Sequence, residues 1–459
     1  MSNRKVYITF LGTNAYQSTR YKWITGEDTF ESPYGQEAEL ILAKKHTKYV
    51  PDVVYVFGTE IAIKANWTEW CGWCYRENTL LESKGLGIEP RLQKCLPETT
   101  TIELVTIQDG LESLSQWKIF ESLVAKIEEK DELVIDITHG YRVTPVILSS
   151  ALHFLRLTKQ VTIKHVFYAA FETREQRIID YVGFYDIQDL TEGVARLNDE
   201  ADMRYLLTLS QKGKFPIDLS PLRKGDLFHD LKRLTDSVRN VESHVVGKHA
   251  QKAMDTLARQ LQKSIHDKKI IPTLLLQKIK EKFTKLSYTT QNMMFDEEYF
   301  RVQQELISTL IKHQLFMQAY TVLREYIGSI GMIFIDGSTW KNNQGRNNRF
   351  LYGETFLGMI QFAHEFTITG QNQRAYNILQ PHYNQLLDSG IATQLQTILV
   401  LERKTADHPH SGINSYRTAF AHACTKQLGV PEGWENAAEY WLKQLKIITA
   451  DIFALQTPS

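Results

Sequence analysis

Two short polar segments in the first third of the chain have the residue types of a phosphate-binding site. They are Gly12-Thr13-Asn14-Ala15-Tyr16 and Asp136-Ile137-Thr138-His139-Gly140-Tyr141-Arg142, the second followed by Pro145. Glycines let backbone N–H groups approach a ligand closely, Thr and Asn add hydrogen bonds, and a helix N-terminus favours anions. Arg142 could give phosphate a planar, charged donor, and Tyr141 or His139 could stack on a nucleobase.

The same two segments also fit a purely structural role. In tight turns between a strand and a helix, Gly12 and Gly140 would serve backbone geometry, and Asp136 would cap the turn that follows it. These residues alone leave both interpretations open. The chain has no G-x-G-x-x-G fingerprint with an acidic residue at the usual offset and no Walker motif, which argues against a dinucleotide cofactor.

A third group of residues, Arg417-Thr418-Ala419-Phe420-Ala421-His422, has the chemistry needed to cleave RNA. His moves a proton near neutral pH, and Arg stabilises charge on a phosphate. RNA carries its own nucleophile, the 2′-hydroxyl, so this chemistry requires no metal. On one ideal helix Arg417 and His422 point about 140° apart, and their geometry improves if the helix begins or bends here, or if two copies meet across a dimer axis.

In isolation the Arg417 and His422 pair fits an amphipathic helix equally well, as surface or core residues. His408 and His410, on either side of Pro409, either line the same cleft or belong to an ordinary loop.

Cys71-Gly72-Trp73-Cys74 has the C-x-x-C spacing of a redox pair or half of a zinc site. A zinc site needs two more ligands, and only Cys95 is near in sequence. A thioredoxin-like motif would open a helix, whereas this segment is rich in tryptophan. We therefore expect buried or incidental cysteines here, with neither a metal nor a redox role.

Short runs rich in β-branched and aromatic residues alternate with helical patterns up to about residue 190. The expected strands are Lys5–Leu11, Asp52–Phe57, Thr101–Ile107, Glu132–Ile137, Val161–Tyr168 and Ile178–Tyr185, and the clearest helices are Glu37–His46, Leu111–Lys130 and Pro145–Leu157. This alternation predicts a Rossmann-like α/β domain with a mainly parallel sheet covered by helices on both faces. Both polar segments would then lie at the carboxyl ends of strands, where ligands bind in open α/β sheets.

From Leu197 onward the pattern is helical. An apolar stripe predicts one long helix through Leu227, Leu231, Leu234, Val238, Val241 and Val245. Further helices are expected within Ile271–Leu286, Tyr299–Ile330, Gln371–Leu387 and Trp434–Leu455, and an exposed loop over Gly337–Gly345. The prediction is thus an α/β domain followed by about 260 all-α residues, in two units.

Composition limits the possible partners and the compartment. The 459 residues contain 53 Lys+Arg and 53 Asp+Glu, so a nucleic acid would contact a local pocket and not a broad basic surface. Four cysteines indicate a reducing compartment. The apolar stretch Val6–Leu11 is too short for a signal sequence. The longer run Val143–Leu155 contains the polar residues Ser149, Ser150 and His153, so we do not expect it to span a membrane. We expect a soluble cytoplasmic protein with no membrane partner.

Taken together, these segments resemble the CARF–HEPN ribonucleases, ancillary effectors of type III CRISPR systems. The resemblance rests on FLGTNAY (10–16), DITHGYRVTP (136–145) and RTAFAHA (417–423), and in architecture it covers the whole chain. It implies a CARF sensor domain (1–190) that dimerises and binds a cyclic oligoadenylate, a helical linker (191–290) and a HEPN domain (291–459). Paired Arg-x-x-x-x-His motifs of two HEPN domains would form one composite, metal-independent RNase site.

The resemblance assigns a role to individual residues. The sensor residues are Gly12, Thr13, Asn14, Thr138, His139, Gly140, Tyr141 and Arg142, and the catalytic residues are Arg417 and His422. Two positions depart from the family pattern: many members have Asn at the position of Arg142, and Asn, Asp or His at that of Thr418. The charged stretch with Lys263, Lys268, Lys269, Lys278, Lys280 and Lys282 is expected to be a solvated helix face.

The resemblance also implies the activity and its partners. We expect a homodimer or higher oligomer, activated by cyclic tetra-adenylate, that cuts single-stranded RNA to a 2′,3′-cyclic phosphate without metal or cofactor. Two alternatives stay open: a ligand-responsive regulator without catalysis, and a sensor domain that also cleaves its own cyclic oligoadenylate.

Overall fold

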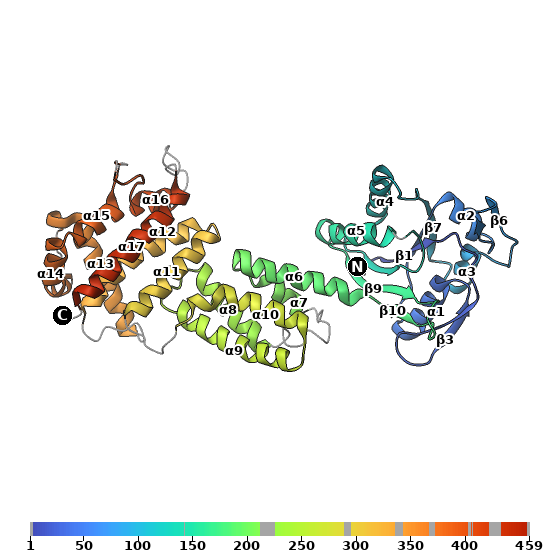
Figure 1. Ribbon diagram of the computed structural model, residues 1–459, viewed down its shortest axis with the longest axis horizontal. Coiled ribbons are helices and arrows are strands. Elements are labelled where there is room, and N and C mark those ends of the chain that lie inside the picture. The colour runs from blue at the N-terminus through green and yellow to red at the C-terminus, as the bar shows by residue number, and fades with distance from the viewer. Residues whose placement is uncertain are drawn as a thin grey trace. The chain divides into compact units, whose positions relative to one another are not determined.

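The computed structural model describes residues 3–141, 143–211, 225–288, 295–335, 343–366, 372–402, 405, 407–421 and 433–456. Internal contacts divide the chain into two compact units, residues 1–186 and 187–459 (Figure 1). The expected domain boundaries at residues 190 and 290 stay predictions. No helix in the described ranges is both long enough and apolar enough to cross a membrane.

The first unit is built on a six-stranded sheet. Its strands are β1 (Lys5–Leu11), β4 (Val53–Gly58), β7 (Thr101–Thr106), β8 (Glu132–Asp136), β9 (Thr162–Ala169) and β10 (Ile178–Asp180). They lie in the order β10-β9-β8-β1-β4-β7, and all pairs are parallel except β9 with β10. At the centre, Ile8 of β1 pairs with Tyr55 of β4 and with Ile135 of β8.

Helices cover both faces of this sheet because successive side chains of its strands point to opposite sides. Val6, Ile8 and Phe10 of β1 join one apolar core, and Tyr7 and Leu11 join the other. The core of Val6 is covered by α4 (Ser113–Lys126) and α5 (Thr144–Thr158); that of Tyr7 by α1 (Gly35–Thr47), α2 (Glu60–Asn66) and α3 (Ile88–Cys95). The expected α/β fold with a mainly parallel sheet is confirmed.

The strand order places a topological switch point between β1 and β8. The chain leaves β1 through α1 to reach β4 on one side, and after β7 it returns through α4 to β8 on the other side of β1. A crevice therefore opens at the carboxyl ends of β1 and β8. The two polar segments found in the sequence follow these two strands directly.

Some elements of the first unit differ from the sequence prediction. Two hairpins were not expected, because their strands are very short: β2 (Thr19–Lys22) with β3 (Thr29–Ser32), and β5 (Trp73–Cys74) with β6 (Thr79–Leu80). The predicted strand Ile178–Tyr185 is wrong beyond Asp180. The Asp180 carboxylate accepts the Val182 N–H at 3.0 Å, as a helix cap does, and α6 (Val182–Glu200) begins there.

Apart from α6, which begins in the first unit, the described part of the second unit contains α-helices and short 3₁₀ turns and no strand. Its helices are α7 (Arg204–Gln211), α8 (Gly225–Arg239), α9 (Val246–His266), α10 (Ile270–Phe283), α11 (Glu297–Lys312), α12 (Phe316–Ile330), α13 (Asn343–Phe362), α14 (Asn372–Asp388), α15 (Ile391–Val400), α16 (Ile413–Ala421) and α17 (Trp434–Gln456). The 3₁₀ turns are η2 (Thr284–Leu286), η3 (Gly331–Phe334) and η4 (Ala363–Glu365). One continuous apolar core joins these helices.

Two predictions for the helical unit need correction. The stripe from Leu227 to Val245 does not form one helix, because α8 ends at Arg239 and Val241 has a φ of +60°. The helical structure expected within Tyr299–Ile330 is confirmed and consists of two helices, α11 and α12, with a break between them where Gln314 has a φ of +56°. A left-handed backbone cannot continue a right-handed helix. The loop expected over Gly337–Gly345 is wrong at its end, since α13 begins at Asn343, and its residues 337–342 lie outside the described ranges.

Candidate functional site

The loop after β1 is fixed by hydrogen bonds from two neighbouring side chains. The side-chain amide of Asn66 in α2 donates to the carbonyls of Gly12 and Asn14, at 2.9 and 3.0 Å. The Gly12 N–H donates to the hydroxyl of Tyr16 at 2.8 Å. A Cβ at residue 12 would lie 2.7 Å from that hydroxyl, so a larger residue here would displace the Tyr16 hydroxyl and its hydrogen bond. The Gly12 N–H is therefore used within the loop, whereas the Asn14 side chain is exposed.

The loop after β8 is anchored by Asp136 and Thr138, whose side chains bond to the sheet. Asp136 accepts the Thr9 hydroxyl at 2.6 Å and the Thr138 N–H at 2.8 Å, so it does cap the turn. The Thr138 hydroxyl accepts the N–H of Ala169 at 2.8 Å. These two residues of the Asp-x-Thr-His-Gly segment thus position the loop, while His139 to Tyr141 follow at its outer end.

Gly140 allows this loop to turn into helix α5. Its φ is +105°, a conformation that L side chains rarely adopt, and a Cβ there would lie 3.2 Å from the Cβ of Phe10. Pro145 lies in the first turn of α5, as expected. The structural and ligand-binding interpretations of Gly140 are therefore compatible, because the turn exposes its backbone at the crevice.

His139 has an unused polar atom in apolar surroundings. Its ring lies 4.4 Å from that of Tyr16 and 6.1 Å from that of Phe171, centroid to centroid. Its Nε2 atom is buried and forms no hydrogen bond within the part of the chain that the structure describes. Burial lowers the pKa of His139 to about 3, so the imidazole is neutral at physiological pH. An unpartnered buried nitrogen at a ligand crevice is a candidate ligand contact.

The two loops are joined by Tyr75, which sequence reasoning missed. Its hydroxyl donates to the Thr13 hydroxyl at 3.2 Å and lies 3.5 Å from the Tyr141 hydroxyl. The hydrogen bond with Tyr75 raises the pKa of Tyr141 to about 12. Tyr75 is 58% exposed, so it presents a ring edge and a hydroxyl to the crevice. No motif marks this residue, because its contacts are with residues far along the chain.

The Cys-Gly-Trp-Cys segment supports the first loop from the side. Gly72 has a φ of +88°, and a Cβ there would lie 2.4 Å from the backbone nitrogen of Ala15. The Trp73 N–H donates to the Thr13 carbonyl at 2.8 Å. Cys71 and Cys74 are free thiols, and Cys71 is buried. Across the described ranges, no group of three or more His, Cys, Asp and Glu side chains is placed to hold a metal.

Comparison with known proteins identifies this unit. Residues 6–172 match the family model of the CRISPR system endoribonuclease Csx1, CARF domain. The chain contains a CARF domain. A CRISPR-associated protein of Methanocaldococcus jannaschii is 24% identical in an alignment 226 residues long, which covers 41% of this chain. The match spans only 36% of that relative's length. The matched family is thus that of a CARF domain, and the relative is named as a CRISPR-associated protein.

Beside the crevice of the CARF domain lies an acidic groove. It runs along the carboxyl ends of β4 and β7 and reaches Tyr141. Its charged lining residues are Glu60, Asp109, Glu112, Lys118 and Glu121. Because four carboxylates face one amine, the groove disfavours phosphate, and an anionic ligand is directed toward the β1 and β8 loops. Arg142, expected to contact that phosphate, lies outside the described residues, so its role stays a prediction.

Outside the CARF domain, the residue of interest is Arg417 on α16. Ile413 and Tyr416 bury this helix in the core, where the Tyr416 ring stacks on Tyr320 of α12 at 5.0 Å. Arg417, the residue after Tyr416 on α16, lies on a different side of this helix and is partly exposed. It forms no ion pair with any residue that the structure describes. His422, the expected partner, lies outside the described residues, so the geometry of the pair stays a prediction.

The loop before α16 packs against α17. The His408 Nδ1 atom lies 3.2 Å from the Tyr440 hydroxyl, and the His410 ring meets the Tyr440 ring edge-on at 5.3 Å. The Trp441 indole donates to the Ser411 carbonyl at 2.8 Å. Both histidines therefore pack against α17, and their place in a cleft shared with His422 stays a prediction.

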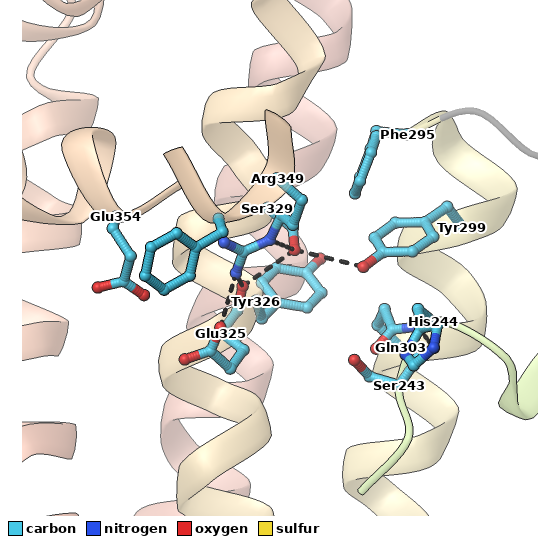
Figure 2. Close-up of a pocket in the computed structure, with 11 residues that line it drawn as sticks. Ser243, His244, Phe295, Tyr299, Gln303, Glu325, Tyr326, Ser329, Arg349 and Glu354 are labelled. Atoms are coloured by element: carbon cyan, nitrogen blue, oxygen red, sulfur yellow. Dashed lines mark hydrogen bonds and ion pairs between the residues drawn. The ribbon is translucent and has the colours of Figure 1, made fainter. Parts of the chain in front are cut away.

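A further pocket of the helical unit surrounds Arg349 of α13 (Figure 2). The guanidinium donates to the Ser329 hydroxyl at 3.0 Å, and to the carbonyl and carboxylate of Glu325 at 2.7 and 2.9 Å. It lies so close to Gly328 and Gly353 that a Cβ on either would contact it. Since Glu325 balances its charge, Arg349 ties α12 to α13, and we assign it a structural role.

Proposed function

We propose that the chain is a cyclic oligoadenylate-activated endoribonuclease that cuts single-stranded RNA without a metal, as part of type III CRISPR defence. The main support for this proposal is the crevice of the CARF domain. There the loop after β8 carries the unpartnered nitrogen of His139, and the hydroxyls of Thr13, Tyr75 and Tyr141 link this loop to the loop after β1. A site of neutral polar groups and aromatic rings suits adenine bases, which stack and hydrogen-bond.

The activator in this proposal is cyclic tetra-adenylate, bound by a homodimer. A ring with two-fold symmetry matches two copies of one crevice related by a two-fold axis. Exposed apolar side chains support self-association: Leu114 and Trp117 on α4, and Val146, Phe154 and Leu157 on α5. The rings of Trp117, Phe120 and Phe154 contact one another in series, so the patch is continuous across the two helices.

The catalytic pair in this proposal is Arg417 with His422. The 2′-hydroxyl of RNA attacks the adjacent phosphorus as the bond to the 5′-oxygen breaks, which leaves a 2′,3′-cyclic phosphate and a 5′-hydroxyl. His422 moves the proton, and Arg417 stabilises charge on the phosphate. The partial exposure of Arg417, without an ion pair among the described residues, supports its assignment. Ligand activates by binding the arrangement with aligned pairs more tightly.

The test is cleavage of a fluorescent single-stranded RNA in EDTA, with cyclic tri-, tetra- and hexa-adenylate added one at a time. We expect cleavage with cyclic tetra-adenylate and a 2′,3′-cyclic phosphate product. The Arg417→Ala variant should cleave RNA about 10²-fold more slowly or worse, and it should still bind cyclic tetra-adenylate. A protein that binds a ring without cutting RNA contradicts the nuclease assignment, and one that binds no ring contradicts the sensor assignment.

A further inference from the structure

Two buried carboxyl groups lie next to the loop after β8. Glu39 is on α1 and Asp136 is the last residue of β8, and both residues are 0% exposed. In the described ranges neither carboxyl forms an ion pair with Lys, Arg or His. Two adjacent carboxylates that are buried without a cation cannot both ionise, because desolvation and mutual repulsion oppose the second charge. The pair must therefore hold a proton.

Asp136 accepts two short hydrogen bonds and Glu39 accepts one short and one long bond, so the ionised form is better stabilised at Asp136 and we assign the proton to Glu39. The Asp136 carboxylate accepts from the Thr9 hydroxyl and the Thr138 N–H, which favour its ionised form. Glu39 accepts from the Tyr7 hydroxyl at 2.6 Å, and its other oxygen lies 3.4 Å from the Thr138 hydroxyl. Burial raises the pKa of Glu39 well above its usual range, and the charge of Asp136 raises it further. The pKa of Asp136 is raised by burial too, but its bonds from Thr138 and Thr9 oppose that rise.

The other titratable groups around the pair do not replace this proton. Tyr7 of β1, Tyr16 after β1 and Tyr21 of β2 all have a pKa raised mainly by burial, and the charge of Asp136 raises each one further. All three are therefore neutral at physiological pH. The next carboxylate on α1, Glu37, accepts from the Ser32 hydroxyl at 2.5 Å and is paired with Arg91 at 3.1 Å. It belongs to a separate group of contacts.

We propose that Glu39 is a positioning residue, protonated at neutral pH, which together with Asp136 fixes the loop that carries His139. Thr138 is the link, since its N–H bonds to Asp136 and its hydroxyl lies between Glu39 and the Ala169 N–H. A second negative charge on Glu39 would repel Asp136 and displace Thr138, and His139 with it. The effect on ligand affinity rests on the function proposed above; the protonation state and the order of the loop do not.

The first measurement is infrared spectroscopy of the full chain at neutral pH. A protonated carboxyl group has a carbonyl stretching band that a carboxylate lacks. We expect this band in the wild-type protein and in the control Glu37→Gln, and its loss in Glu39→Gln. Absence of the band from the wild-type protein, or its persistence in Glu39→Gln, would overturn the proposal.

The second measurement is amide hydrogen exchange of residues 137–141 without ligand. Exchange should be faster in Glu39→Ala and return to the wild-type rate in Glu39→Gln, because the Gln amide can donate to Asp136 in place of the proton. If Glu39→Ala does not fold, Glu39→Asp replaces it, since it keeps the carboxyl but shortens its reach. An unchanged exchange rate in the truncated variant refutes the positioning role.

The third measurement is binding of cyclic tetra-adenylate. We expect Glu39→Ala to bind it about tenfold more weakly or worse, because the loop must be ordered on binding, and Glu39→Gln to restore affinity. Wild-type affinity in Glu39→Ala would contradict the positioning role. If the wild-type protein binds none of the rings, the proposed function fails, and the infrared band and the exchange rates still decide the role of Glu39.

Discussion

At the scale of single residues, His139 is the side chain whose contribution to ligand affinity should be measured first. Its ring packs on Tyr16 and its Nε2 atom has no partner in the described residues, so packing and hydrogen bonding can be separated. His139→Phe keeps a ring and removes the nitrogen, and His139→Ala removes both. We expect His139→Phe to weaken cyclic tetra-adenylate binding by about 3- to 10-fold, the effect of one hydrogen bond, and His139→Ala by more.

The control is His266→Phe at the end of α9, an exposed histidine of the helical unit, which should bind cyclic tetra-adenylate as the wild-type protein does. Binding should be nearly independent of pH between about 5.5 and 8, since the pKa of His139 is lowered to about 3 and its ring stays neutral. Equal affinities of His139→Phe and wild type, or affinity that rises as His139 acquires a proton near pH 6.5, would contradict a neutral contact.

The depressed pKa of His139 also has a consequence for stability. Below about pH 6.5 the unfolded chain binds a proton at this ring that the folded chain excludes, so folding stability falls as the pH falls toward 3. His139→Phe should reduce this acid sensitivity. Thermal unfolding of His139→Phe and of the wild-type protein, measured at several pH values, tests this expectation. Like the binding assay, it reports whether the His139 ring is neutral in the folded protein.

The sequence predicted some of these residues for chemical reasons that are local. Gly12 and Gly140 stand where a Cβ would clash or where φ is positive, and Asp136 caps its own turn. Tyr75 and Asn66 could not be predicted, because their partners in the loop after β1 lie more than 50 residues away. Long-range contacts of this kind depend on the hairpin and helix that bring them together, and a one-dimensional pattern does not encode that placement.

At the scale of elements, α4 and α5 form the surface on which a dimer should depend. Trp117 is 62% exposed and lies at one end of the aromatic series Trp117, Phe120 and Phe154. A charge at this position would be buried by a second copy of the chain, and in a symmetric dimer two such charges would be buried, each at a cost in free energy. We expect Trp117→Glu to shift the protein from dimer to monomer in sedimentation-velocity measurements.

The matched control is Ile265→Glu on α9, where an exposed apolar residue of the helical unit receives the same charge. It should leave the dimer intact. In the proposed mechanism the Trp117→Glu monomer also loses ring-activated RNA cleavage, because its Arg417 has no second copy to meet. A Trp117→Glu protein that stays dimeric would show that the dimer contact lies on another surface.

Element boundaries show the limit of sequence patterns at this scale. The apolar stripe through Leu234, Val238 and Val241 continues across the break after α8, because Val241 packs against the same core after the helix has ended. Periodicity measures which residues are buried, and a turn that preserves the buried face leaves no mark in it. The positive φ at Val241, unusual for a β-branched residue, is set by tertiary packing.

At the scale of the whole molecule, the two units have separate cores. The cores on both faces of the sheet draw their residues from the first unit, including Tyr181, Val182 and Tyr185 near its end. The helical core begins at Ile187 and Leu190. The change from alternating strands and helices to helices alone, visible in the sequence near residue 190, therefore reflects a real change of core. What the sequence could not provide is the arrangement of Arg417 and His422, the pair proposed as catalytic, because it depends on packing between helices.

Separate cores predict that residues 1–186 fold and sense ligand without the rest of the chain. Ending at Asp186 keeps the Tyr181 and Tyr185 contacts and leaves out Leu190, which would otherwise expose apolar surface. We expect this fragment to unfold cooperatively and to bind cyclic tetra-adenylate within about threefold of the affinity of the full chain, since both crevice loops are retained. It should not cut RNA, because it lacks Arg417 and His422. Recovery of linear oligoadenylate from the fragment would show that the sensor also cleaves its ligand, and a fragment that folds but does not bind would mean that the helical unit completes the site.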